Sequence, residues 1–199
     1  MIICIDAGHS FVTKGHRCPK DLDSSETREW LLNDRIARKV QSFLRKYDCT
    51  VIRGDDTTGK RDIPHRQRLI RAAKNGVDCY ICIRHSYGCK DGGVGGVIVY
   101  SHTDASDNAF NLQNSIYTSI MSESNITSDR KNPTPKTNFH ELVMAPKDSV
   151  ICECGFMDSA DNVPVILSAE YANIVAKSIA MSIVNVYDLK KRKDVKNVK

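Results

Sequence analysis

The chain has 199 residues, of which 41% are hydrophobic and 27% are charged, and its formal net charge is +5. This length and composition are ordinary for one soluble globular domain with a full core. No run of 18 or more apolar residues occurs, which excludes a membrane-spanning helix of the usual kind.

Positive charge is concentrated at the C-terminal end. Residues 188–199 hold six Lys or Arg and two Asp, so this segment carries +4 of the net charge of +5. The body of the chain is therefore close to neutral, which argues against a nucleic-acid-binding face. We expect a single domain at residues 1–187 and a basic tail or linker at 188–199. Contact of the tail with an anionic polymer or membrane surface is the alternative.

Strand-like and helix-like segments alternate along the chain. Short apolar or β-branched runs predict strands, and apolar residues at helical spacing predict helices. In chain order, we expect a strand at 2–6, a helix at 29–47, a strand at 49–53, a helix at 64–75, strands at 79–83 and 95–100, a helix at 107–122, a strand at 150–154 and a helix at 168–187. This alternation predicts a layered α/β fold with a largely parallel sheet.

Two further segments read as irregular structure. Residues 123–138 are rich in Ser, Thr, Asn, Asp and Pro, which predicts a surface loop. The glycines at 92, 93, 95 and 96 predict a tight turn into the following strand.

The eight cysteines are expected to be reduced thiols. Most of them lie inside apolar, strand-like runs, where a free cysteine behaves as a small hydrophobic residue. The N-terminus is strand-like from the start, and we expect no secretory signal peptide and no oxidising compartment. Cys79 and Cys82 have the spacing of half a zinc ribbon, but residues three apart in a strand face opposite sides.

Polar side chains stand where predicted strands end. His9 follows the first strand, His85 follows the third, and Glu153 lies near the end of the last. Glu29 opens the first long helix, on the side where the preceding strand ends. Because open α/β sheets build their sites at the carboxyl ends of the strands, we expect these four side chains at one edge.

These residue types suit a catalytic zinc site. Such a site takes three protein ligands from His and carboxylate and leaves one position for a water that becomes the nucleophile, assisted by a nearby carboxylate. Each residue also has a plainer interpretation: a loop histidine, a Glu29 that favours the helix dipole, or an edge-strand charge at Glu153. However, Glu153 interrupts an otherwise apolar strand, where an ionised carboxylate is costly unless it is paired or used.

Four segments together resemble a known family. They are Asp-Ala-Gly-His at 6–9, Glu-x-x-x-Asn-x-x-Ile-Ala at 29–37, the strand leading to His85, and Glu-x-Gly-Phe-Met-Asp-Ser-x-Asp at 153–161. In this order they are similar to the zinc-dependent N-acetylmuramoyl-L-alanine amidases of cell-wall turnover and phage lysis. The resemblance implies Zn²⁺ ligands at His9, Glu29 and His85, a catalytic carboxylate at Glu153, and a sheet of about six strands flanked by helices.

The resemblance also implies a substrate and a setting. The family cleaves the amide between the lactyl group of N-acetylmuramic acid and the first L-alanine of the stem peptide, so bacterial peptidoglycan is the expected partner. We expect synthesis in the cytoplasm and action on the wall after release by lysis or a holin, with a wall-binding module beyond the basic tail. The alternatives are a zinc peptidase or other amidohydrolase, and a non-catalytic wall-binding module.

One position departs from the family pattern, and another offers a rival for one of the expected metal ligands. Where the family has Ser-Ile-His-x-Asn, this chain has Ile-Arg-His-Ser-Tyr at 83–87, so Tyr87 replaces the Asn. Glu26, three residues before Glu29, is the rival metal ligand, although the helical register with Asn33 favours Glu29. The other histidines, His16, His65, His102 and His140, are expected to be ordinary surface or loop residues.

Overall fold

The computed structural model describes residues 1–89 and 93–193. Gly92 of the predicted turn and residues 194–199 of the predicted tail lie outside this range. The elements are β1 (Ile2–Ala7), α1 (Glu29–Leu44), β2 (Thr50–Arg53), α2 (His65–Lys74), β3 (Cys79–Ser86), β4 (Ile98–His102), α3 (Asp107–Glu123), β5 (Lys136–Thr137), α4 (His140–Val143), β6 (Asp148–Phe156), α5 (Val163–Ile166) and α6 (Ala169–Val186).

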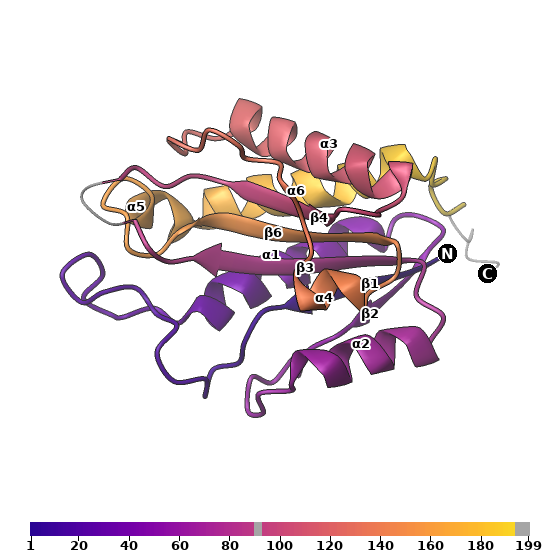
Figure 1. Cartoon of the computed structure of the whole chain (residues 1–199), viewed down its shortest axis with the longest axis horizontal. Coiled ribbons are helices and arrows are strands. Elements are labelled where there is room, and N and C mark those ends of the chain that lie inside the picture. Colours follow the sequence, from indigo (N-terminus) through magenta and orange to yellow (C-terminus); the bar gives the residue numbers. More distant parts are fainter. Residues whose placement is uncertain (90–92, 194–199) are drawn as a thin grey trace, which may run out of the picture.

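One six-stranded sheet runs through the described residues, in the order β2-β1-β3-β6-β4-β5 (Figure 1). All neighbouring strands pair in parallel except β4 and β6, which are antiparallel. The predicted α/β fold with a largely parallel sheet of about six strands is therefore confirmed. In a parallel arrangement the carboxyl ends of β1, β3 and β6 meet at the same edge of the sheet.

Helices cover both faces of the sheet, which explains why its strands are apolar on both sides. α1, α3 and α6 pack over one face, and α2 and α4 lie over the other (Figure 1). Ile3 and Ile5 of β1 join the larger core under α1, whereas Cys4 between them joins the smaller core under α2. No helix of the described residues is long and apolar enough to span a membrane.

The structure corrects two predicted boundaries that matter for the site. β3 continues to Ser86, so His85 lies inside the strand, and the pairing of β3 with β6 shifts register between Arg84 and Ser86. β4 begins only at Ile98, later than predicted, because Gly95 and Gly96 have positive φ angles of 89° and 118° that do not fit an extended ladder.

The predicted surface loop at 123–138 ends in a short edge strand. The main-chain N–H groups of Val99 and Ser101 donate to the carbonyls of Pro133 and Pro135, and β5 then pairs with β4. Proline has no N–H to donate, so a sequence rich in proline gives a weak strand signal even where its carbonyls take part in a sheet.

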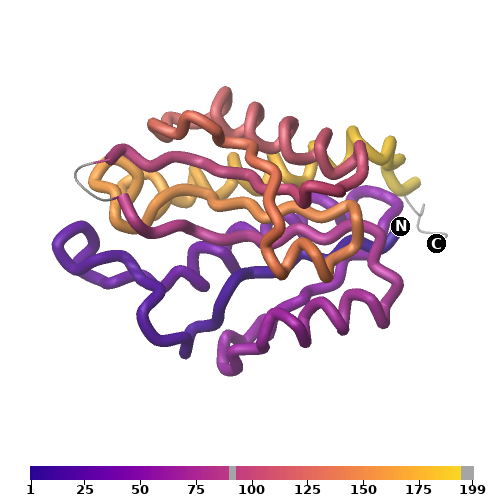
Figure 2. Tube along the Cα trace, in the orientation of Figure 1, coloured from indigo at the N-terminus to yellow at the C-terminus, as the bar shows by residue number. Residues whose placement is uncertain are grey.

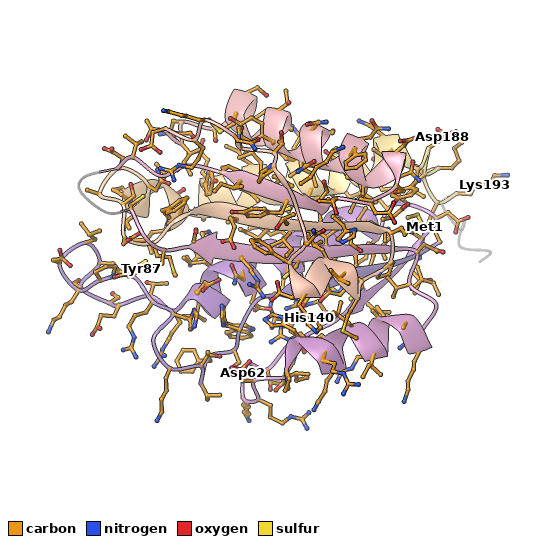
Figure 3. The ribbon with its side chains drawn as sticks, in the orientation of Figure 1. Met1, Asp62, Tyr87, His140, Asp188 and Lys193 are labelled. Carbon is orange, nitrogen blue, oxygen red and sulfur yellow. The ribbon has the colours of Figure 1, made fainter. Side chains whose placement is uncertain are left out.

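The predicted tail is attached to the domain over its described part. The guanidinium of Arg192 donates to the carbonyls of Tyr47 and Cys49, in the turn between α1 and β2. Met1, Asp188 and Lys193 lie together at one end of the molecule, and Tyr87 lies at the opposite end (Figure 3). The charged segment up to residue 193 therefore leaves from the end of the sheet that is farthest from Tyr87.

Candidate functional site

A cavity of about 560 Å³ opens at the carboxyl edge of β1, β3 and β6. The segment between β1 and α1, drawn in indigo, forms one side of this end of the molecule (Figure 2). The cavity is lined by His9, Gly15, His16, Arg17, Cys18, Pro19, Glu26, Glu29, Arg84, His85, Ser86, Tyr87, Glu153 and Met157. All four predicted site residues are in this set, so the structure brings them to one place.

His9 is held at the cavity by its own backbone. The main-chain N–H of Gly8 donates to Ile83 at 2.9 Å, and a side chain at position 8 would place its Cβ only 2.8 Å from Cγ of Arg84. His9 itself has a positive φ of 63°, and its carbonyl accepts a 2.7 Å hydrogen bond from the buried Arg68. These constraints direct the imidazole towards Glu29, with Nε2 3.3 Å from Oε2.

Glu29 is the buried centre of the site, at the first position of α1. Its Oε2 lies near His9 and also 3.2 Å from Nδ1 of His16. Its Oε1 accepts from the main-chain N–H of His85 at 3.1 Å and from Nδ2 of Asn33 at 3.2 Å. Burial pushes the pKa of Glu29 upwards, but the hydrogen bond with His16 and the nearby histidines outweigh it, so the pKa is lowered. The carboxylate is therefore ionised at neutral pH.

The protonation state of His85 follows from its neighbour. Nδ2 of Asn33 donates to the carbonyl of Gly8 and to Glu29, so Oδ1 of Asn33 is left to accept from Nδ1 of His85 at 2.8 Å. Burial lowers the pKa of His85 to about 4, so the ring is neutral. Its Nε2 is therefore a free lone pair, and it is buried without a partner among the described residues. A neutral imidazole fixed in this way is a typical metal ligand.

Glu153 faces the cavity from β6, beside Arg84 on β3, which is its register partner. Its Oε2 is shielded from solvent and has no hydrogen-bond partner within the described part of the chain. Burial and, to a smaller extent, the charge of Glu29 raise the pKa of Glu153 to about 8, although Arg84 opposes this. Cys152 and Cys154 pack into the larger core on the opposite face, as predicted.

Arg84 is oriented by partners outside the predicted set. One Nη donates to Oε1 of Glu141 at 2.7 Å and lies 2.7 Å from Nε2 of His65. The Nε of Arg84 is buried and has no partner among the described residues. Three polar atoms of the cavity lining, from Arg84, His85 and Glu153, are thus buried and unpartnered in the described chain. Such groups are costly unless a ligand, ion or water meets them.

The rival ligand Glu26 does not join the histidines. Its carboxylate lies 3.6 Å from Arg17, and the residue has a positive φ of 48° ahead of α1. Glu29, and not Glu26, meets His9 and His16.

His16 is the site residue that the sequence prediction missed. Within the described residues, one group of three could hold a metal ion, and it consists of His9, His16 and Glu29, whose ligand atoms lie within 4.8 Å of one another. His85 lies outside this group, although its main chain contacts Glu29. One signal was present in the sequence: Gly15-His16 repeats the Gly8-His9 step that drew attention to the first strand.

The donor atoms fit a zinc ion. Zinc binds imidazole nitrogen and carboxylate oxygen, and it favours neutral imidazoles and an ionised carboxylate. Burial lowers the pKa of His9 to about 4, so its ring is neutral, as is that of His85. The ionised Glu29 beside two imidazoles, with the unpartnered Nε2 of His85 in the same cavity, meets these requirements.

A comparison with protein families gives a match over nearly the whole chain. A protein-family model described as N-acetylmuramoyl-L-alanine amidase matches residues 3–185. No curated protein sequence gives a significant match.

Solved structures share the fold at low sequence identity. The amidase AmiC2 of Nostoc punctiforme has a TM-score of 0.80 and 20% identity, over 94% of this chain and 97% of that chain. An amidase from Clostridium difficile 630 has a TM-score of 0.81 and 22% identity, over 94% and 96%. The catalytic domain of CwlV from Bacillus (Paenibacillus) polymyxa var. colistinus has a TM-score of 0.80 and 20% identity, over 95% and 99%.

Proposed function

Because the chain belongs to the N-acetylmuramoyl-L-alanine amidase family, we propose that it hydrolyses the amide between the lactyl group of N-acetylmuramic acid and the first L-alanine of the stem peptide. One observation supports this most strongly. A buried carboxylate with imidazole neighbours and a second, shielded carboxylate line the same cavity. These are the two components that metal-assisted amide hydrolysis needs.

In this proposal His9, Glu29 and His85 hold Zn²⁺. The neutral rings of His9 and His85 and the ionised Glu29 supply two imidazole nitrogens and one carboxylate oxygen. When bound, Zn²⁺ supplies a Lewis acid that polarises the scissile carbonyl and lowers the pKa of a water molecule. Asn33 fixes the tautomer of His85, and the backbone N–H of His85 orients Glu29, so both ligands are set before the metal binds.

Glu153 moves the proton. Its Oε2 accepts a proton from the attacking water as the C–O bond forms at the lactyl carbonyl. It then delivers this proton to the amine nitrogen of L-alanine as the C–N bond breaks. The raised pKa of Glu153 in the metal-free protein suits the second step, because a carboxyl group that holds its proton near neutral pH is an effective general acid. The first step needs the ionised form, which the positive charge of a bound Zn²⁺ beside Glu29 would favour.

The setting of the reaction is also part of the proposal. The protein would be made in the cytoplasm and would reach the wall after lysis or through a holin. A wall-binding module would follow the basic segment, whose described part up to Lys193 lies at the end of the molecule opposite Tyr87 (Figure 3). The wall-binding module rests on the basic charge of residues 188–199 alone.

The variant Glu153→Gln tests the proposed role of Glu153 as the proton carrier. We expect the wild-type protein, loaded with Zn²⁺, to release free N-terminal alanine from purified muropeptides. The Gln variant should lose on the order of 10²–10⁴-fold in rate while its zinc content stays unchanged, because the variant removes a proton carrier and no ligand. Glu170→Gln, at an exposed position of α6, is the matched control and should retain full activity.

Two results would contradict different parts of the proposal. If the wild type never exposes N-terminal alanine but cleaves other amides, the chain is a peptidase or other amidohydrolase. If Glu153→Gln matches the wild type in every assay, including binding to cell walls, the non-catalytic module is favoured instead.

A further inference from the structure

His16 lies at the metal-binding group without having been assigned a role there. Its ring stacks on that of His9, with the ring centroids 3.6 Å apart and an angle of 28° between the planes. Its Nδ1 is 3.2 Å from Oε2 of Glu29, and Nε2 of His9 is 3.3 Å from the same oxygen. Two imidazole nitrogens from different turns of one loop are therefore directed at one carboxylate oxygen.

These separations match those between neighbouring ligand atoms of one metal ion. A tetrahedral zinc site with metal–ligand distances near 2.0–2.2 Å has ligand atoms roughly 3.3–3.6 Å apart. The two distances to Oε2 of Glu29 are close to this value, and all three ligand atoms lie within 4.8 Å of one another. A hydrogen-bonded cluster can show similar distances, so the experiment has to separate the two cases.

The backbone holds His16 in this position. The main-chain N–H of Glu29 donates to the carbonyl of His16 at 2.9 Å, which ties the loop to the first residue of α1. On either side, the N–H of Cys18 donates to Thr27, and the guanidinium of Arg28 donates to the carbonyl of Thr13. His16 is therefore a fixed part of the cavity wall, although 44% of its side chain is exposed.

We propose that His16 is a further ligand of the metal ion, beside His9 and Glu29. This inference rests on the metal site of the proposed function. With His85 as the remaining imidazole, four protein groups would hold the ion, so the water of the proposed function would have to displace one of them. The side chain of His16 is far more exposed than that of His9 or Glu29, so its imidazole is the one that this water would displace, while the backbone at residue 16 stays in place.

The test compares His16→Ala with His102→Ala in the full chain. His102 lies on β4, where its Nδ1 accepts from the main-chain N–H of Asp104, and it is not among the residues that line the cavity. X-ray absorption of the zinc-loaded proteins counts the imidazoles, and competition with a chromophoric chelator measures affinity. His16→Ala should lose one imidazole and on the order of tenfold or more in zinc affinity, while His102→Ala keeps both values.

A second variant separates ligation from a structural role. In His16→Cys, a thiolate replaces the imidazole, and loading with Co²⁺ should give a sulfur-to-cobalt charge-transfer band that the wild type lacks. Because an unfolded chain would also bind Co²⁺ through its eight native thiols, the band counts only if the far-UV circular dichroism of the variant matches that of the wild type. If the band is absent and His16→Ala keeps the wild-type imidazole count and affinity, the inference about His16 is overturned.

The failure of this inference can be told from the failure of the proposed function. His9→Ala and Glu29→Ala should both abolish tight zinc binding. If they do so while His16→Ala has no effect, the proposed metal site stands and only the role of His16 is wrong. If the wild-type protein itself takes up no zinc, the metal site of the proposed function fails and the role of His16 fails with it.

Discussion

The carboxylate of Glu153 is kept protonated by its surroundings, and this makes the stability of the metal-free protein depend on pH. Its pKa is raised from 4.5 to about 8 in the folded state, chiefly by burial. The folded state therefore binds this proton more tightly than the unfolded state. The stabilising contribution is complete below the unfolded pKa and is lost as the pH rises through the folded pKa.

Glu153→Gln should therefore gain stability relative to the wild type as the pH increases. We expect the two metal-free proteins to have similar free energies of unfolding at about pH 4, and the variant to be the more stable at about pH 9, because Gln cannot ionise. Urea denaturation at both pH values, with a chelator present, measures this difference. A gap between the two proteins that stays constant across the range would contradict the raised pKa of Glu153.

At individual residues, the sequence predicted four side chains that meet in one cavity, but it did not predict that His16 joins them. Glu153 stood out because it interrupts an apolar strand, and His9 because it ends one. His16 could not be predicted in the same way, because its position depends on hydrogen bonds between the loop and the start of α1. Those contacts leave no periodic pattern, and only the repeated Gly-His step pointed to it.

At the level of elements, a buried ion pair joins β1 to α2 and supports the backbone of His9. Arg68 is 1% exposed and donates to Asp6 Oδ1, to the carbonyl of Ala7 and to that of His9, each at 2.7 Å. The hydroxyl of Tyr80 donates to the other oxygen of Asp6. The spacing of apolar residues predicted α2 almost to its ends. It could not predict that a charged residue, Arg68, lies on the buried face of this helix.

Arg68→Met should destabilise the protein by ~3–5 kcal/mol, because Asp6 is left as a buried charge without a partner. Adding Asp6→Asn to this variant should recover part of the loss, since the uncompensated charge is then removed. Urea denaturation of the wild type, both single variants and the double variant measures these changes. If the double variant is destabilised by the full sum of the single effects, the two side chains act independently and the assignment of an ion pair is wrong.

The elements that the sequence missed share a physical cause. β5 has two residues, and α4 and α5 have four each, so none of them is long enough to show a period. The late start of β4 depends on the left-handed conformations of Gly95 and Gly96. A glycine in the sequence permits such a conformation but does not require it.

For the whole molecule, the parallel sheet explains why distant segments share one site. Residues 9, 29, 85 and 153 meet because β1, β3 and β6 are adjacent and parallel, so that their carboxyl ends lie at one edge. This rule allowed the meeting to be predicted without any coordinates. The same rule could not predict that β4 pairs with β6 in the antiparallel direction. The direction of the strand after the turn at Gly95 and Gly96 depends on contacts across the sheet.

The cysteines offer a test of the fold as a whole. All eight are free thiols, and Cys79 and Cys82 face different cores, as their spacing predicted. Seven are buried, and Cys89 alone is partly accessible. Burial raises the pKa of the buried thiols, and of Cys89 as well, which lowers the fraction of reactive thiolate.

The native, metal-free protein should therefore react with a thiol reagent at Cys89 only, and slowly, whereas the denatured protein should show all eight thiols without added reductant. Cys89→Ser should abolish the native reaction and leave the denatured count lower by one. Fast reaction at several sites in the native protein would mean that the two cores are not closed as described. Fewer thiols than expected after denaturation would reveal a disulfide, which would contradict the reduced cysteines inferred from their positions in apolar strands.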